Sequence, residues 1–192
     1  RLFNPDMPVT LETGVEFTGK LKVIRNLDLV ASARKSVLTN LTKNNRLDSF
    51  SVLPRVHSDW GYYDIHGQKG HIKALKFSYL ENIAPSFYGR AHFGLLEPFF
   101  AGLGGEIIYK PASSPFALGL DIHRVKQRDY DMLFDLRSYE TTVGHFSIYY
   151  DVGGMFDVEV NAGRYLAKDL NGQSPGDRYI RVAMVSELEE TK

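Results

Sequence analysis

The chain contains no cysteine among its 192 residues. This absence excludes disulfides, zinc–thiolate sites and a cysteine nucleophile. A net charge is missing as well, because Lys+Arg and Asp+Glu are 23 each. Bulk charge therefore favours neither nucleic acid nor an anionic membrane surface as a partner, and no nucleic acid is expected. The apolar runs are too short for a transmembrane helix, and the N-terminal RLFNPDMPVT has no apolar signal-peptide core.

Aromatic residues and glycine are abundant, with 11 Tyr, 12 Phe and 17 Gly. The dominant pattern is alternation with period two, which is typical of strands, and helical periodicity is almost absent. In Val15–Val23, for example, Phe17 and Leu21 share one face, while Glu16 and Lys20 take the other. The sequence therefore predicts a chain built mainly from β-strands.

The alternating segments predict an antiparallel all-β fold of about nine strands. Their lengths, roughly nine to eleven residues, match tilted membrane strands better than soluble strands of about five to six residues. Strand length thus favours an outer-membrane-type β-barrel, whole or partial. The predicted strands are Val15–Val23, Asn26–Ser36, His71–Leu80, Phe87–Leu95, Phe100–Lys110, Phe116–Val125, Thr142–Val152, Phe156–Leu166 and Tyr179–Val185.

Four segments interrupt the pattern. Ser51–Gly70 predicts either a long loop or a strand broken by bulges, and Lys126–Tyr139 predicts a charged excursion away from the sheet. Asn40–Arg46 and Asn171–Asp177 are polar or Gly/Pro-rich connections.

Alternation alone does not decide what the two faces of the sheet contact. In a membrane barrel the apolar face meets lipid and the polar face lines the lumen. In a soluble sandwich the apolar face forms the core, and the polar face is simply solvated. On the barrel interpretation the candidate lumen charges are Lys73, Lys76, Arg90, Glu106, Asp121, His123, His145 and Glu159.

Three aromatic residues of the Ser51–Gly70 segment, Trp60, Tyr62 and Tyr63, are candidate glycan contacts or interfacial aromatics. Rings with polar tips can stack on sugars. They also form the aromatic belts of membrane proteins, and the belt is the favoured interpretation.

No motif indicates bond chemistry, and the chain is not predicted to be an enzyme. None of the six histidines has a zinc-ligand spacing, so neither a metal nor another cofactor is predicted. A glycosidase pair drawn from Glu97, Glu106, Asp121 and Glu159 is less favoured than charge balance with nearby Lys and Arg. The charged residues Arg124, Lys126, Arg128 and Asp129 are interpreted as a solvated loop.

Several ordered blocks between about residues 50 and 170 carry a resemblance to a known family. They are LPRVHSDWGYYD, LKFSYLENIAPSFYGRAHFGLLEPFFAGLGGEIIYKP, FALGLDIHRVKQRDYDMLF, YETTVGHFSIYYD and AGRYLAKD. In type and order they resemble the YjbH-like exopolysaccharide biosynthesis family. That resemblance implies an outer-membrane protein of the capsule or exopolysaccharide machinery of Gram-negative bacteria, with polysaccharide and outer-membrane lipid as partners. It also implies small periplasmic proteins encoded in the same operon.

Three hypotheses follow, in order of preference. The first is an outer-membrane β-barrel that assists exopolysaccharide or capsule export or assembly. The second is a soluble periplasmic β-sandwich that binds carbohydrate, and the third is a polysaccharide hydrolase. Family members are much longer than this chain, so residues 1–192 are expected to form one antiparallel β domain, a fragment of a longer barrel protein.

Overall fold

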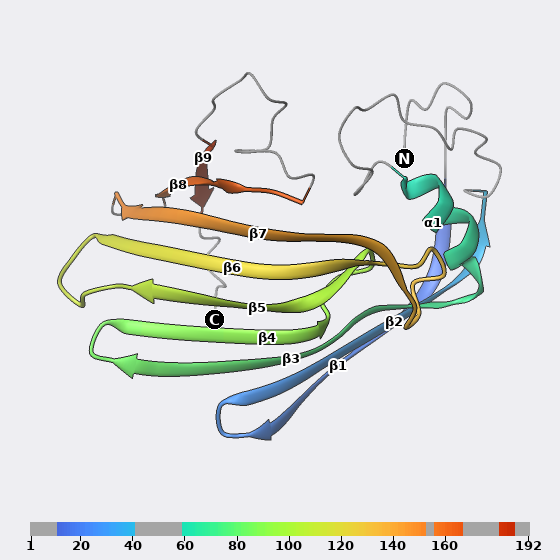
Figure 1. Ribbon diagram of the computed structural model, residues 1–192, viewed down its shortest axis with the longest axis horizontal. Helices are drawn as coiled ribbons and strands as arrows, with labels where there is room; N and C mark the ends of the chain where they lie inside the picture. The colour runs from blue at the N-terminus through green and yellow to red at the C-terminus, as the bar shows by residue number, and fades with distance from the viewer. Residues whose placement is uncertain (1–10, 41–58, 153–155, 167–180, 187–192) are drawn as a thin grey trace.

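A computed structural model describes residues 11–40, 59–152, 156–166 and 181–186. These residues contain nine strands, a short helix and one turn of 3-10 helix (Figure 1). The expected antiparallel all-β architecture is confirmed, and most strands are longer than predicted. The strands are β1 Glu12–Ile24, β2 Leu27–Thr39, β3 His71–Ala84, β4 Phe87–Leu95, β5 Phe100–Tyr109, β6 Phe116–Arg128, β7 Leu136–Asp151, β8 Phe156–Arg164 and β9 Arg181–Ser186.

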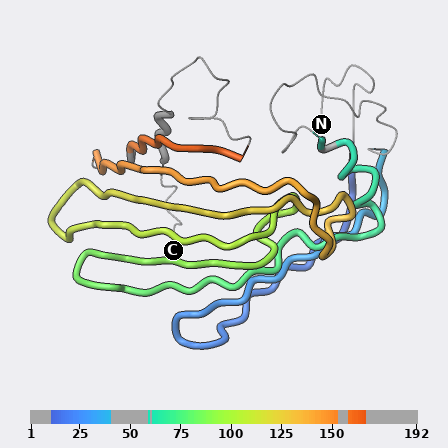
Figure 2. The backbone as a smooth tube through the Cα atoms, viewed as in Figure 1, coloured from blue at the N-terminus to red at the C-terminus, as the bar shows by residue number. Residues whose placement is uncertain are grey.

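All nine strands of the described residues belong to one sheet, in which each strand pairs with its neighbours in the chain (Figure 2). Every pairing is antiparallel, so the sheet is a simple meander. Strands β1 and β9 are its two edges, and the described part of the chain is an open sheet and not a closed barrel. No second sheet is present among these residues to cover either face, as a β-sandwich would require.

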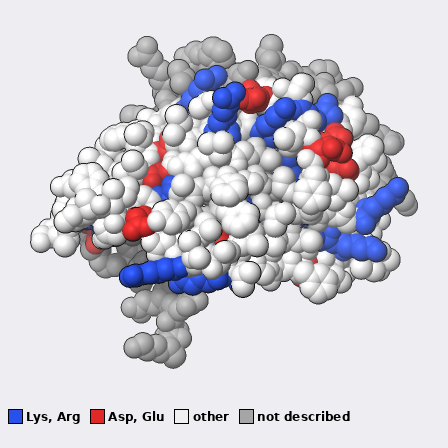
Figure 3. Space-filling model, turned by 60° about the horizontal axis from the view of Figure 1, so that its bottom comes forward, with Lys and Arg blue, Asp and Glu red and all other residues white. Residues whose placement is uncertain are grey.

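The register places nearly all the large apolar side chains of the central strands on one face of the sheet. Leu103 of β5 and Leu120 and Ile122 of β6 lie on this face with side chains that are 60–62% exposed. The same face carries Phe93 of β4 and Phe146 of β7. We call it the apolar face. A broad uncharged area, with charged side chains toward its upper and lower edges, is visible in Figure 3.

The opposite face, which we call the polar face, is the more crowded of the two. The side chains of Glu106, Asp121 and His123 are only 17–20% exposed, although they come from the same strands as the exposed leucines. Side chains crowd on the inner side of a curved sheet and spread apart on its outer side. The sheet therefore curves around its polar face, the reverse of a water-soluble fold with an apolar core.

The short helix α1, Trp60–His66, continues into the 3-10 helix η2, Gly67–Lys69. The prediction of a loop or bulged strand here was wrong, and residues 51–58 of that segment lie outside the described part. Tyr63, Asp64 and Gln68 line a small cavity together with Arg34 and Lys73 of the polar face. Hence α1 lies on the polar side, at one end of the strands. No helix in the described ranges is long and apolar enough to cross a membrane.

The predicted charged excursion over Lys126–Tyr139 was also wrong. Strand β6 continues to Arg128 and β7 begins at Leu136, so only a short connection separates the two strands. Arg124, Lys126 and Arg128 belong to β6, and Arg128 is 0% exposed. Charge alone did not indicate that Arg128 is buried, because its guanidinium is surrounded by backbone carbonyl groups of β3, the β4–β5 connection and the β6–β7 connection. The predicted connections Asn40–Arg46 and Asn171–Asp177 lie outside the described residues, apart from Asn40.

Candidate functional site on the polar face

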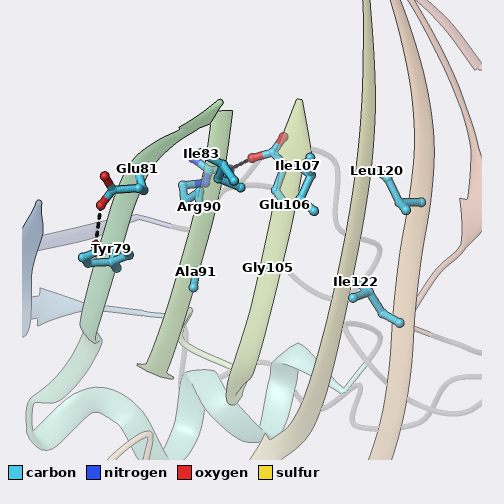
Figure 4. Close-up of a pocket in the computed structure, with 11 residues that line it drawn as sticks. Tyr79, Glu81, Ile83, Arg90, Ala91, Gly105, Glu106, Ile107, Leu120 and Ile122 are labelled. Atoms are coloured by element: carbon cyan, nitrogen blue, oxygen red, sulfur yellow. Dashed lines mark hydrogen bonds and ion pairs between the residues drawn. The ribbon is translucent and has the colours of Figure 1, made fainter. Parts of the chain in front are cut away.

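One register row brings four of the predicted lumen charges together across neighbouring strands. Arg90, Glu106, Asp121 and His145 are direct cross-strand partners on β4, β5, β6 and β7. The Arg90 guanidinium pairs with the Glu106 carboxylate at 2.6 Å (Figure 4). The ring nitrogen Nδ1 of His145 lies 3.2 Å from Asp121 Oδ2. The sequence placed these residues on one face, and the register arranges them in a line.

A second row, one step toward α1, consists of imidazole rings. His92 and His123 flank Gly104 in the register, and their rings stack with centroids 4.6 Å apart. His123 Nδ1 lies 3.2 Å from the same Asp121 oxygen that contacts His145. The two rings can stack because Gly104, which lies between them, has no side chain. A Cβ added to Gly104 would lie 2.0 Å from His123 Cδ2. His92 was not among the predicted site residues, and its pairing opposite a glycine could not be seen without the register.

The other predicted lumen charges lie away from these two rows. Lys73 pairs with Glu16 of β1 at 2.7 Å. Lys76 lies on the polar face of β3, opposite Val30 and Gly94. Glu159 of β8 accepts a 2.7 Å hydrogen bond from Asn161 Nδ2 and lies opposite Tyr149 in the register. The polar face thus pairs many of its charges internally, as expected for side chains that share a confined space.

The three predicted aromatic residues separate in the structure. Tyr63 is 2% exposed, packs on Phe99 and donates a 2.9 Å hydrogen bond to the Arg128 carbonyl oxygen, so it contacts neither a glycan nor a lipid interface. Tyr62 stacks on Tyr130 at 4.9 Å. The side chain of Trp60, the first residue of α1, lies outside the described part. Burial, and secondarily the Asp59 carboxylate, raises the pKa of the Tyr63 phenol well above its ordinary value.

An aromatic row occurs instead at the opposite ends of the strands, on the apolar face. Phe87 packs against Tyr109 with centroids 4.7 Å apart, and Phe116 packs against Tyr150 at 4.5 Å. These cross-strand pairs flank the β3–β4, β5–β6 and β7–β8 connections. Rings at strand ends beside an apolar band are typical of the interfacial girdles of membrane barrels.

Arg128 organises the end of the strands where α1 lies, and we call this region the cap. Its guanidinium donates to the carbonyl oxygens of Ile72 at 2.9 Å and Glu97 at 2.8 Å. It also donates to the carbonyl oxygens of Met132 and, at 2.7 Å, Leu133. Ile72 is at the start of β3, Glu97 lies in the β4–β5 connection, and Met132 and Leu133 lie in the β6–β7 connection. Arg128 therefore ties the start of β3 to two connections, a structural role that sequence reasoning missed.

A shallow apolar groove of about 450 Å³ crosses the apolar face over β3, β4, β5 and β6. Its floor is formed by the small residues Gly89, Ala91 and Gly105, and Ile107 and Ile122 are among its walls (Figure 4). Most of the groove surface is apolar, and Tyr79 and Glu81, which are hydrogen-bonded to each other, also line it (Figure 4).

Among the described residues, no group of three or more His, Asp or Glu side chains is arranged to hold a metal ion. The rings of His92 and His123 are stacked on each other, so their nitrogen atoms do not point toward one common position. The carboxylates of the polar face can accept hydrogen bonds, and its rings offer flat surfaces for contacts with other rings or with C–H groups.

The described residues define a class of all-β proteins built on an open antiparallel sheet, with one exposed apolar face and one crowded, charge-paired polar face. The comparisons narrow this class to one family. Residues 1–174 match the family model described as exopolysaccharide biosynthesis protein YbjH, and the chain belongs to this YjbH family.

A curated relative agrees with the family assignment. The chain is 32% identical over 171 residues to the uncharacterized lipoprotein YjbH of Escherichia coli (strain K12). The matched region is 84% of this chain and 24% of the relative, so the chain spans about a quarter of that protein's length. No solved structure matches the chain.

Proposed function

We propose that the chain is part of an outer-membrane β-barrel that assists the export or assembly of exopolysaccharide at the Gram-negative cell surface. The single observation that carries this proposal is the orientation of the two faces. Large apolar side chains point outward and stay exposed, while charged side chains crowd on the inner side of the curve. In water this arrangement would leave an extended apolar surface uncovered, whereas in a bilayer it places that surface against lipid.

Three further observations support a location in the membrane. Eight of the nine strands are at least nine residues long, the length a tilted strand needs to span a bilayer. The aromatic pairs Phe87–Tyr109 and Phe116–Tyr150 supply a girdle at one end of the apolar face. The word "lipoprotein" in the name of the E. coli relative fits attachment to the cell envelope.

The mechanism we propose is passive. The polar face would line a passage or rim and present paired charges and rings to a sugar chain, without making or breaking bonds. Outer-membrane lipid would contact the apolar face, and small periplasmic proteins of the same operon would be further partners. Because the described sheet is open, the remaining strands of a barrel would come from the rest of a longer polypeptide.

Cell fractionation of the full-length protein, followed by gels of boiled and unboiled samples, tests the proposal. We expect recovery in the outer membrane and a compact species that shifts in mobility on boiling. Deletion of the gene should lower the polysaccharide recovered from the cell surface and the medium. A detergent-independent, soluble periplasmic protein would instead support a carbohydrate-binding module and refute the barrel.

A further inference from the structure

Several rings on the polar face lie close to glycine residues of neighbouring strands. His123 lies over Gly104, as described above. Tyr149 of β7 lies over Gly119 of β6, where an added Cβ would be 3.2 Å from the Tyr149 ring. A Cβ on Gly163 would lie 2.7 Å from the His145 ring. Three rings on β6 and β7 thus each occupy space that a side chain on the neighbouring glycine would need.

The rings lie together across the middle of the polar face. His92 stacks on His123, and the His145 ring contacts Tyr165 with centroids 4.6 Å apart. We call the set His92, His123, His145, Tyr149 and Tyr165 the ring band. It extends from β4 across to the residue that follows β8, and the side chains of His123 and His145 remain 18% and 22% exposed. The His123 and His145 side chains therefore keep part of their surface accessible to a ligand.

Hydrogen-bond acceptors alternate with the rings. Both His123 and His145 contact Oδ2 of Asp121, and Glu159 lies opposite Tyr149 in the register. Arg90, the cation of the adjoining charge row, is already paired with Glu106. A band of rings and carboxylate acceptors, beside which Arg90 is paired and Lys76 is a further cation of the polar face, suits hydroxyl-bearing rings better than a polyanion, which needs several unpaired cations.

We propose that the ring band binds pyranose units of the exopolysaccharide, with sugar C–H faces stacked on the rings and hydroxyls donated to Asp121 and Glu159. This inference rests on the proposed function and deepens it by assigning the sugar-contacting residues. The sequence alone does not reveal the ring band, because its residues come from separate strands. Only the register between strands places glycines next to the rings.

The experiment measures exported polysaccharide, as hexose per cell, in a host strain that lacks its own copy and carries full-length variants. The variant His123→Ala/His145→Ala/Tyr149→Ala should export about tenfold less than wild type, the loss expected when three ring contacts are removed together. Its matched control, Leu120→Ala/Phe146→Ala/Ile148→Ala, truncates the apolar face of the same two strands and should export near wild-type amounts. The variant His123→Phe/Tyr149→Phe, which keeps an aromatic ring at both positions, should lose much less export than the alanine variant.

A pair of adjacent glycines provides a second, gentler test. At Gly104 the atoms that an added methyl group meets belong to the His123 side chain, so Gly104→Ala displaces the ring and not the backbone. Gly105, the next residue, faces the apolar groove, and its closest contact would be 3.3 Å. We expect Gly104→Ala to lower export and Gly105→Ala to leave it unchanged. This pair decides the question if the triple alanine variant fails to assemble.

The outcomes separate the two proposals. If deletion of the gene leaves export unchanged, the proposed function fails. If deletion abolishes export but an assembled, heat-modifiable ring variant exports like wild type, the ring band alone is refuted. An equal loss in the ring variant and in the apolar-face control would also overturn it, because the effect would then not come from the rings.

Discussion

The polar side and the apolar face of the same sheet satisfy opposite requirements. On the polar side, which ends in the cap, charges meet partners: Arg90 meets Glu106, Asp121 meets two imidazoles, and Arg128 meets four carbonyl oxygens. On the apolar face, leucine, isoleucine and phenylalanine side chains remain uncovered. Within this part of the molecule, the internal contacts are made by paired polar groups, whereas the large apolar side chains are not buried against one another. The apolar side chains need to be covered by something outside the described sheet, and we propose that lipid covers them.

Replacing Arg128 with Met should cause the largest loss of stability, because it removes the hydrogen bonds that hold the cap together. Four carbonyl oxygens would lose a charged donor inside a buried site, and we expect a loss of about 3–5 kcal/mol in the free energy of unfolding. The measurement is urea unfolding of the protein refolded in detergent micelles. Arg124→Met is the control, because Arg124 lies on the same strand with a side chain 71% exposed and should lose less than about 1 kcal/mol. Equal losses would contradict the assigned role of Arg128.

The second prediction tests the difference between the faces with two adjacent residues of β1. Phe17 lies on the apolar face and is 74% exposed, and Thr18 lies on the polar face. Phe17→Arg should destabilise the bilayer-inserted protein by about 2–4 kcal/mol, since it places a charge against lipid. Thr18→Arg should cost only the hydroxyl contact with Ser32, about 0.5–1.5 kcal/mol. Unfolding from lipid vesicles measures both, and no difference between them would argue against lipid at the apolar face.

The third prediction concerns Tyr63 and pH. Tyr63→Phe removes the hydrogen bond to the Arg128 carbonyl and should lower stability by about 0.5–1.5 kcal/mol at pH 8. Since the folded state raises the pKa of this phenol above 10, the wild type keeps its full stability below pH 10 and loses part of it above, where the unfolded chain ionises. The gap between wild type and variant should therefore narrow at pH 11. A gap that widens with pH would show that Tyr63 ionises more easily in the folded state.

The smallest expected effect lies in the charge row. The Arg90 side chain is 52% exposed, so its pairing with Glu106 is partly screened. A double-mutant cycle with Arg90→Met and Glu106→Gln should give a coupling of about 0.2–1 kcal/mol. The cycle is measured by urea unfolding in micelles. A coupling several times larger would mean that the polar face is more tightly closed than its exposure indicates.

Much of the fold could be predicted because alternation is a local property. All nine predicted strands exist. The errors have a common cause. Arg128 carries the same charge as the exposed Arg124, and it is buried because the start of β3, the β4–β5 connection and the β6–β7 connection meet around it. Likewise, the helix over Trp60–His66 is short and is held by packing of Tyr63 against Phe99 and Tyr130, which lie far away in the sequence.

The candidate site divides in the same way. Period-two spacing sufficed to place Arg90, Glu106, Asp121, His123 and His145 on one face, because side chains alternate along any strand. It could not indicate that His92 and His123 stack across Gly104, because this depends on the register between strands. By itself the sequence determined the strands and their two faces. Tertiary structure alone decided the direction of curvature, the residues at the cap and the partners of each charge, because these depend on contacts between residues far apart in the chain.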